Sequence, residues 1–336
     1  MSESMQKRQN FLSIAEPEQI FACNCEKTEQ PGEKIRWKIK KNGKQKKKVT
    51  LRSATSPSPS RTMIHAMEDV SAYFPSGSVT GLIGESGSGK SLLGMSILGL
   101  LSGQARVEGS CMYKGMDLYR LPEKEMQKIR GKEIALIPQN PTESLTPIRR
   151  IGKQLTECMT VHGNKDKELA DSRRDEFLRR FGFSDPDRIN RAYSFQLSGG
   201  MNQRVISAMG LMNRPKWVIA DEPTKGLDAI LRRQVYRVLK EISETDTEGM
   251  IVITHDIALA GALCDRLMVL YKGSIMEAGE TKTILEHPAH PYTKGLIASL
   301  PGKGMNPIGR AVRKKEGNSG CSFYPRCAHA VDACKN

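Results

Sequence analysis

Residues Gly84-Glu85-Ser86-Gly87-Ser88-Gly89-Lys90-Ser91 decide the fold of this 336-residue chain. The stretch fits the phosphate-binding P-loop pattern at every required position, follows the apolar run 79–83 and opens the helix-like segment 90–101. Glycines let the backbone turn its N–H groups toward phosphate oxygens, and the helix start adds a positive dipole end. We expect all eight residues to bind nucleotide phosphates, with Lys90 on the β- and γ-phosphates and the Ser91 hydroxyl on Mg²⁺.

Short apolar runs alternate with helix-like segments on both sides of the P-loop. The runs are 79–83, 134–137, 217–220, 251–253 and 267–271, and the helical segments are 90–101, 166–181, 202–212, 229–243 and 257–263. Uninterrupted apolar runs of this length suit strands that are buried on both faces of a sheet. The alternation predicts an α/β fold with a mostly parallel sheet and flanking helices.

Two acids end the apolar run that begins at Trp217. Asp221 at a strand end can hold the Mg²⁺ shell, and Glu222 follows it directly. Side chains alternate along a strand, so we expect Glu222 to point away from Asp221, where it could polarise an attacking water. Buried acids are costly without a cation or water partner, which favours a hydrolytic site over a structural strand end.

A second phosphate-binding candidate is Leu197-Ser198-Gly199-Gly200-Met201. Ser198 is a good helix N-cap, and the two glycines expose backbone N–H groups at a helix start. By itself this pattern is more often only a cap and a turn. Its place between the P-loop and the Asp221-Glu222 strand gives it more weight.

With these motifs in this order, the chain resembles the ABC ATPases, whose signature is Leu-Ser-Gly-Gly. The resemblance implies that Ser198, Gly199 and Gly200 contact the γ-phosphate bound by an opposite subunit, so that two chains work head to tail. It further implies cofactor-binding, metal and catalytic roles for single residues. These are Gln139 as the Q-loop glutamine touching Mg²⁺ or water, His255 as the catalytic switch histidine, and Asp228 in the D-loop Gly226-Leu227-Asp228.

Later motifs resemble the oligopeptide/dipeptide/nickel importer group of that family. They are His287-Pro288-Ala289-His290-Pro291-Tyr292-Thr293 and Gly320-Cys321-Ser322-Phe323-Tyr324-Pro325-Arg326-Cys327. Met201 and the segment 224–228 are slightly more similar to the nickel and metal-chelate members than to the peptide members. The group implies four partners: a second ABC ATPase subunit, identical or different, two transmembrane permease subunits and an extracytoplasmic solute-binding protein.

Some members of the group hold an iron–sulfur cluster on tail cysteines, which makes Cys321, Cys327 and Cys334 candidate ligands for a [4Fe-4S] cluster. Such a cluster usually takes four thiolates, and the tail to Asn336 supplies three. A tail that only packs or stays flexible is the alternative. The pair Cys23 and Cys25 is too isolated to define a metal site.

Composition restricts the cellular setting. The longest apolar stretch, 92–101, is far shorter than the roughly 20 residues of a spanning helix, and the polar N-terminus lacks a secretion signal. We expect a peripheral protein on the cytoplasmic face of the membrane.

The net charge is +15, and residues 34–52 hold ten Lys or Arg and no acid. This basic arm could be a solvated extension, bind anionic lipid or bind nucleic acid.

The expected organisation has three parts: a basic N-terminal extension at 1–48, the nucleotide-binding domain at 49–280 and a small Cys-containing appendage at 281–336. Within the domain we expect an antiparallel β subdomain and an inserted helical subdomain at about 140–197. The adenine contact stays open, because the stretch 53–61 lacks the aromatic residue that the family places there. His65 is a weak substitute and Trp37 another.

The sequence thus favours the ATP-hydrolysing subunit of an ABC importer for peptides or nickel and metal chelates. The alternative is a non-transport ABC ATPase that acts on nucleic acid or ribosomes through the basic arm. A pseudo-ATPase scaffold is a third reading, against which the intact acids and lysine argue.

Overall fold

The computed structural model describes residues 49–51, 64–67, 70–101, 105–300, 305, 308–309 and 320–335. They fall into two compact units: the first holds 75–79 and 121–254, and the second holds the other described residues. The predictions for Cys23, Cys25, Trp37 and the basic segment 34–48 lie outside the described residues, as does the side chain of His65.

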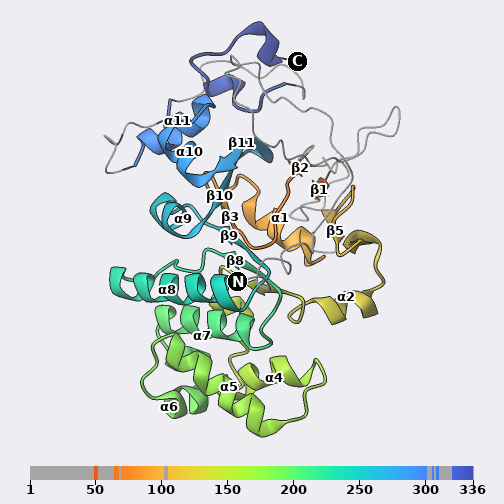
Figure 1. Cartoon of the computed structure of the whole chain (residues 1–336), viewed down its shortest axis with the longest axis vertical. Coiled ribbons are helices and arrows are strands. Elements are labelled where there is room, and N and C mark those ends of the chain that lie inside the picture. The colour runs from red at the N-terminus through yellow and green to blue at the C-terminus, as the bar shows by residue number, and fades with distance from the viewer. Residues whose placement is uncertain are drawn as a thin grey trace, which may run out of the picture. The chain divides into compact units, whose positions relative to one another are not determined.

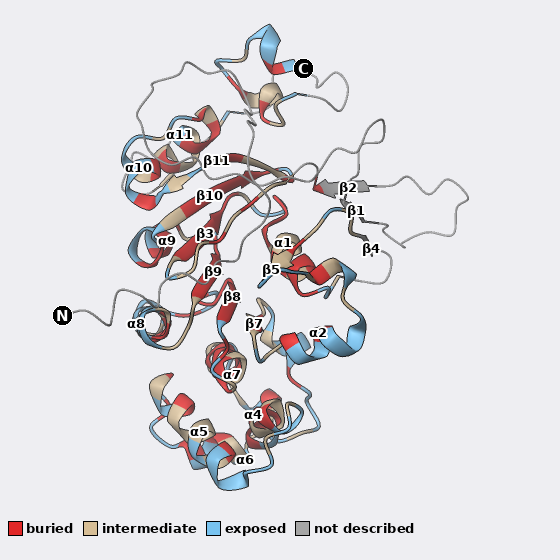
Figure 2. Ribbon diagram, turned by 45° about the vertical axis from the view of Figure 1, so that its right-hand side comes forward, coloured by how far each residue is buried: buried red, intermediate tan, exposed pale blue. Residues whose placement is uncertain are grey.

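The strands of the first unit are parallel and almost entirely buried. They lie in the order β9-β8-β7, with bounds Gly249–Ile253, Trp217–Asp221 and Ile134–Ile137. Every residue of β8 and β9 is buried, as the red ribbons of Figure 2 show. Because both faces of such strands are covered, the sequence shows unbroken apolar runs rather than alternation.

Helices make up the rest of this unit. They are α2 (Glu123–Ile129), α3 (Pro141–Ser144), α4 (Ile151–Thr160), α5 (Lys167–Arg180), α6 (Pro186–Arg191), the 3₁₀ turn η2 (Ser194–Gln196), α7 (Gly199–Leu211) and α8 (Ala229–Thr245). Helices α4, α5, α6 and α7 pack on one another, and α7 also packs on β7. The segment 140–197 is therefore largely helical, while the limits of the expected domains stay a prediction.

The second unit holds the parallel pair β3 (Val79–Ile83, of which Val79 counts with the first unit) and β10 (Arg266–Tyr271). Strand β11 (Ser274–Glu280) pairs with β10 in an antiparallel hairpin. A separate antiparallel sheet has the order β2-β1-β4, with bounds Ile64–Met67, Val49–Leu51 and Ala105–Arg106. A small hairpin joins β5 (Met112–Tyr113) to β6 (Met116–Asp117). The α/β class with mostly parallel core strands and added antiparallel β structure is confirmed.

The helices of the second unit are α1 (Lys90–Ile97), α9 (Ile257–Leu263), α10 (Thr281–Glu286) and α11 (Pro291–Ala298), with 3₁₀ turns η1 (Leu118–Arg120), η4 (Tyr324–Arg326) and η5 (Asp332–Lys335). Helix α10 packs on β10, β11 and α9, and α11 packs on β11, as can be followed in Figure 1. None of the described helices is both long and apolar enough to cross a membrane.

Helix α1 is shorter than the sequence predicts. It ends at Ile97 because Gly99 takes a left-handed φ of 61°, and the N–H of Leu100 returns to the carbonyl of Met95 at 3.0 Å. This is a glycine-terminated helix end, in which the left-handed residue satisfies the last carbonyls.

Candidate nucleotide-binding site

The P-loop in the second unit forms a tight turn between β3 and α1. Gly84, Gly87 and Gly89 have positive φ values of 150°, 78° and 101°. At Gly84 the requirement is steric as well, since an added Cβ would lie 2.1 Å from the carbonyl oxygen of Leu270. Glycine is therefore the residue that this turn admits at its first position.

Lys90 begins helix α1 and is 7% exposed. Its ammonium donates to the carbonyls of Gly84 at 2.8 Å and Glu85 at 2.9 Å, and to Ser88 Oγ at 3.4 Å. The cation thus lies within the curve of the loop. The loop itself is held to the neighbouring hairpin, because Gly273 N–H donates to the Ser88 carbonyl at 2.9 Å.

In the first unit, Asp221 is the last residue of β8 and Glu222 follows it, with exposures of 5% and 6%. The expectation that strand alternation orients Glu222 is wrong, because the strand ends at Asp221 and Glu222 takes a left-handed φ of 49°. Two contacts fix Glu222 instead. Its N–H donates to the Ile253 carbonyl at 2.8 Å, and its Oε2 accepts a long hydrogen bond of 3.4 Å from the Thr254 hydroxyl.

The chemistry of these residues fits Mg²⁺. The ion prefers carboxylate, hydroxyl and phosphate oxygens over nitrogen or sulfur ligands. Asp221 supplies a buried carboxylate, whose burial is costly unless a cation or hydrogen bonds offset it, and Ser91 supplies a hydroxyl beside Lys90. The two residues belong to different units, and each carries an oxygen of a kind that Mg²⁺ binds.

Ser198 and Asp228 are both helix N-caps in the first unit. The Ser198 hydroxyl accepts from the Met201 N–H at 3.3 Å and starts α7, and Ser198 and Gly199 are exposed. The Asp228 carboxylate accepts from the N–H groups of Ile230 and Leu231, both at 2.9 Å, and starts α8. The start of α7 thus presents backbone N–H groups at the surface of its unit, a geometry that attracts anions.

Gln139 and His255 each follow a parallel strand and precede a helix. Gln139 is half-buried, two residues beyond β7 and just before Asn140, which caps α3. His255 is exposed between β9 and Asp256, which caps α9. Carboxyl ends of parallel strands are where ligands bind in open α/β sheets, so both positions agree with the predicted roles.

The sequence analysis missed three residues around the P-loop. Tyr292 is fully buried and its hydroxyl accepts from the Glu85 N–H at 3.0 Å. Arg326 Nη1 contacts both carboxylate oxygens of Glu85, at 3.1 and 3.0 Å. His290 caps α11 by accepting from the Tyr292 N–H at 3.1 Å. All three lie in the later motifs that resemble the oligopeptide/dipeptide/nickel group, but no local pattern indicates that Tyr292 and Arg326 contact Glu85.

The tail cysteines Cys321, Cys327 and Cys334 all lie in the second unit. Cys327 and Cys334 are buried, and Cys321 Sγ lies 3.9 Å from His290 Nε2. Among the described residues, no group of three or more His, Cys, Asp or Glu side chains is arranged to hold a metal ion. The expected iron–sulfur cluster at Cys321, Cys327 and Cys334 thus gains no support from the structure.

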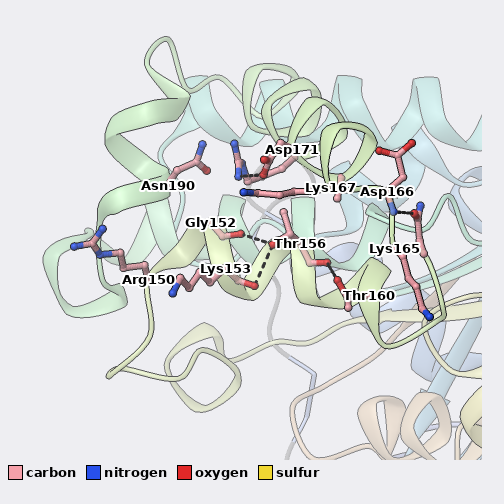
Figure 3. Close-up of a pocket in the computed structure, with 13 residues that line it drawn as sticks. Arg150, Gly152, Lys153, Thr156, Thr160, Lys165, Asp166, Lys167, Asp171 and Asn190 are labelled. Atoms are coloured by element: carbon pink, nitrogen blue, oxygen red, sulfur yellow. Dashed lines mark hydrogen bonds and ion pairs between the residues drawn. The ribbon is translucent and has the colours of Figure 1, made fainter.

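A pocket of about 530 Å³ lies in the first unit at the starts of α4 and α5 (Figure 3). Its lining is rich in basic side chains: Arg150, Lys153, Lys165, Lys167 and Arg174. None of the residues predicted to bind nucleotide lines it. The pocket is therefore separate from the candidate site.

Comparison with known families and proteins indicates the class of protein. Residues 67–225 match the ABC transporter family, and residues 276–334 match the oligopeptide/dipeptide transporter C-terminal region. The oligopeptide transport ATP-binding protein OppD of Haemophilus influenzae is 37% identical over 279 residues, which cover 81% of this chain and 86% of the relative. The corresponding protein AppD of Bacillus subtilis is 38% identical, covering 81% and 85%.

Among solved structures, a dimeric post-hydrolysis state of the ATP-binding cassette MJ0796 with ADP and phosphate matches with a TM-score of 0.62 and 27% identity. The match covers 70% of this chain and 97% of that one. Fold, motifs and relatives agree on the class, an ATPase of the P-loop type. The chain belongs to the ABC transporter family of ATP-binding subunits, in the branch that carries the oligopeptide/dipeptide C-terminal region.

Proposed function

We propose that this chain hydrolyses ATP to drive the import of peptides or of nickel and metal chelates. In the proposal it acts from the cytoplasmic face of the membrane, with a second ATPase subunit, two permease subunits and an extracytoplasmic solute-binding protein. The C-terminal region at 276–334 and the relatives named for oligopeptide and dipeptide transport support peptides as the first cargo to test. The same relatives favour a transporter over the nucleic-acid alternative.

In the proposed reaction, the P-loop at 84–91 holds the phosphates with backbone N–H groups other than that of Glu85, which donates to Tyr292, and Lys90 neutralises charge on the β- and γ-phosphates. Glu222 orients the attacking water and accepts its proton, while His255 and Gln139 contact the γ-phosphate and the water. Mg²⁺, held by Ser91 and Asp221 when bound, supplies Lewis-acid neutralisation of the phosphate oxygens. Preorganised groups of this kind lower the barrier because they already face the charge that develops.

The observation that carries the two-subunit arrangement is the exposed start of helix α7. Ser198 and Gly199 offer an anion site at the surface of the first unit. Ile230, the second residue of α8 in the same unit, is 81% exposed. An exposed anion site and an exposed apolar side chain in the same unit suit contact with a second cassette and its nucleotide.

The decisive experiment traps that complex. We expect Glu222→Gln to bind Mg-ATP with wild-type affinity, to lose at least about 100-fold in turnover because the proton acceptor is gone, and to dimerise with ATP. Size-exclusion chromatography with light scattering detects the dimer, a phosphate-release assay measures turnover, and ATP titration measures affinity. The variant Lys90→Ala is the control that should bind no ATP and stay monomeric. Normal hydrolysis by Glu222→Gln would refute the proposed role of Glu222.

Contact with permease subunits is proposed at the helical segment of the first unit. Ile148, just before α4, is 84% exposed, and Phe195 in η2 is 72% exposed. An isolated bridge pairs Arg150 with Tyr193, and the ring of Tyr193 stacks on Phe195. Exposed large apolar side chains of this kind mark interaction surfaces.

A further inference from the structure

The P-loop contains an acid, Glu85, in a segment whose task is to bind a polyanion. Its side chain is 39% exposed, and it directly follows Gly84, whose carbonyl contacts the Lys90 ammonium. A carboxylate within several ångströms of a triphosphate repels it by direct Coulomb interaction, and this repulsion is weakened by solvent and salt. An uncompensated Glu85 would therefore lower the affinity for the nucleotide.

Arg326 compensates that charge from the far end of the chain, 241 residues away. Its Nη1 contacts both carboxylate oxygens, and its side chain is 19% exposed. The guanidinium is fixed from other sides too. Its Nε donates to the Gly309 carbonyl at 2.9 Å, and it lies 5.7 and 5.9 Å from the ring centres of Tyr271 and Phe323. Because several contacts hold it in place, little conformational entropy opposes the ion pair.

Tyr292 fixes the backbone at the same residue. Its hydroxyl accepts the Glu85 N–H, and burial raises the pKa of Tyr292 to about 12, so the hydroxyl stays neutral at physiological pH. The ring packs against Tyr271, at 4.7 Å between ring centres, and against Phe323, at 5.3 Å. The aromatic cluster Tyr271, Tyr292 and Phe323 thus connects α11 and the tail rigidly to the P-loop.

We propose that Arg326 and Tyr292 are positioning residues for nucleotide binding: Arg326 cancels the charge of Glu85, and Tyr292 fixes the Glu85 backbone. This deepens the proposed function and rests on it, because it takes the P-loop to be the ATP site. It gives the C-terminal region a role in tuning ATP affinity that requires no metal cluster.

The test is a charge-rescue series in the full chain. We compare dissociation constants of Mg-ATP for wild type, Arg326→Gln, Glu85→Gln and the double variant by titration calorimetry. Arg326→Gln should weaken binding by about 3- to 10-fold at low salt, less at high salt, and less for ADP than for ATP, since fewer phosphate charges are repelled. The double variant should return to within about twofold of wild type, because the repelling charge is gone. Arg326→Lys keeps the charge and should retain most of the affinity.

Two controls separate charge from structure. Arg191→Gln, at an exposed position of α6, makes the same change in net charge and should leave ATP binding unchanged. Tyr292→Phe keeps the ring but removes the acceptor, so it should weaken binding in a way that Glu85→Gln does not rescue.

The outcomes are separable. Wild-type ATP affinity in Arg326→Gln would overturn the proposed role of Arg326. A double variant that binds ATP as weakly as Arg326→Gln would also overturn it, because the loss of affinity would then come from lost packing and not from the uncancelled charge of Glu85. If neither the wild-type chain nor Lys90→Ala binds ATP, the proposed function itself fails, and not only the role of Arg326.

Discussion

Glu222 has a backbone conformation that is uncommon for a residue other than glycine, with a left-handed φ of 49°. A left-handed φ at a non-glycine residue costs about 1–3 kcal/mol, and it persists only where neighbouring contacts enforce it. Here the N–H bond to Ile253 and the turn from Glu222 to Lys225 enforce it. Strain of this kind gathers at functional sites, which agrees with the proposed role of the carboxylate as the group that activates water.

Thr254 gives a prediction at this scale, because its buried hydroxyl donates to the Glu222 carboxylate. Removing the donor in Thr254→Val should loosen the carboxylate and lower kcat by about tenfold with little change in KM, the pattern for an interaction that acts in the transition state. Steady-state ATPase assays measure both constants. Thr254→Ser keeps the hydroxyl and serves as the control; equal activity in the two variants would contradict this role.

Gly84 gives a second residue-scale prediction. Its backbone φ of 150° and the 2.1 Å approach of a Cβ to the Leu270 carbonyl leave no room for a side chain. Gly84→Ala should displace the loop, abolish ATP binding and lower thermal stability, which thermal melts and ATP titration detect. Gly77→Ala is a matched control, because Gly77 also has a positive φ of 72° but nothing lies within 4 Å of an added Cβ. It should lose stability only and keep its ATP affinity.

At the scale of elements, two helix starts can be compared directly. Ser198 caps α7 and Asp166 caps α5, where its carboxylate accepts from the Leu169 N–H at 3.0 Å. Ser198→Ala and Asp166→Ala should each cost about 1 kcal/mol of folding free energy. Only Ser198→Ala should also reduce turnover, because only that helix end is proposed to face a second cassette's nucleotide. Urea denaturation measures the folding free energy of both variants, and phosphate release measures their turnover. Equal turnover in the two variants would contradict the proposed contact of Ser198 with a second cassette's nucleotide.

The elements themselves were largely predictable from sequence. Apolar runs located β3 and β7 with the observed bounds, because strands buried on both faces leave that trace. Periodicity placed α9 at the observed residues. It overran the end of α1 because one glycine conformation, at Gly99, decided where the helix stops. It also misjudged Glu222, since a left-handed residue after a strand breaks the alternation that the sequence implies.

At the scale of the whole molecule, contacts between residues far apart in the chain could not be predicted from the sequence. The P-loop residues were identified from their spacing, but Tyr292 and Arg326 reach Glu85 across separations of 207 and 241 residues. Nothing in a local pattern encodes such a pair, which arises only when α11 and the tail pack on Tyr271.

The proposed assembly gives the prediction at this scale. Ile148→Asp places a charge on an 84% exposed apolar position and should abolish copurification with the permease pair while the isolated chain keeps its ATP affinity. Leu169→Asp, at a 42% exposed position on α5, is the matched control and should still copurify. Loss of the complex in both variants would mean a general effect of the added acid.

The long separation between Glu85 and its counter-charge also sets an order of events during synthesis. A ribosome synthesises the P-loop and the strands around it before it reaches Arg326, so a nascent chain would carry the uncancelled charge of Glu85 until Arg326 is made and packs on it. A nascent chain that lacks Arg326 would then bind ATP with lower affinity than the folded subunit. On the proposed role of Arg326, full ATP affinity would arrive only after Arg326 has formed its ion pair with Glu85.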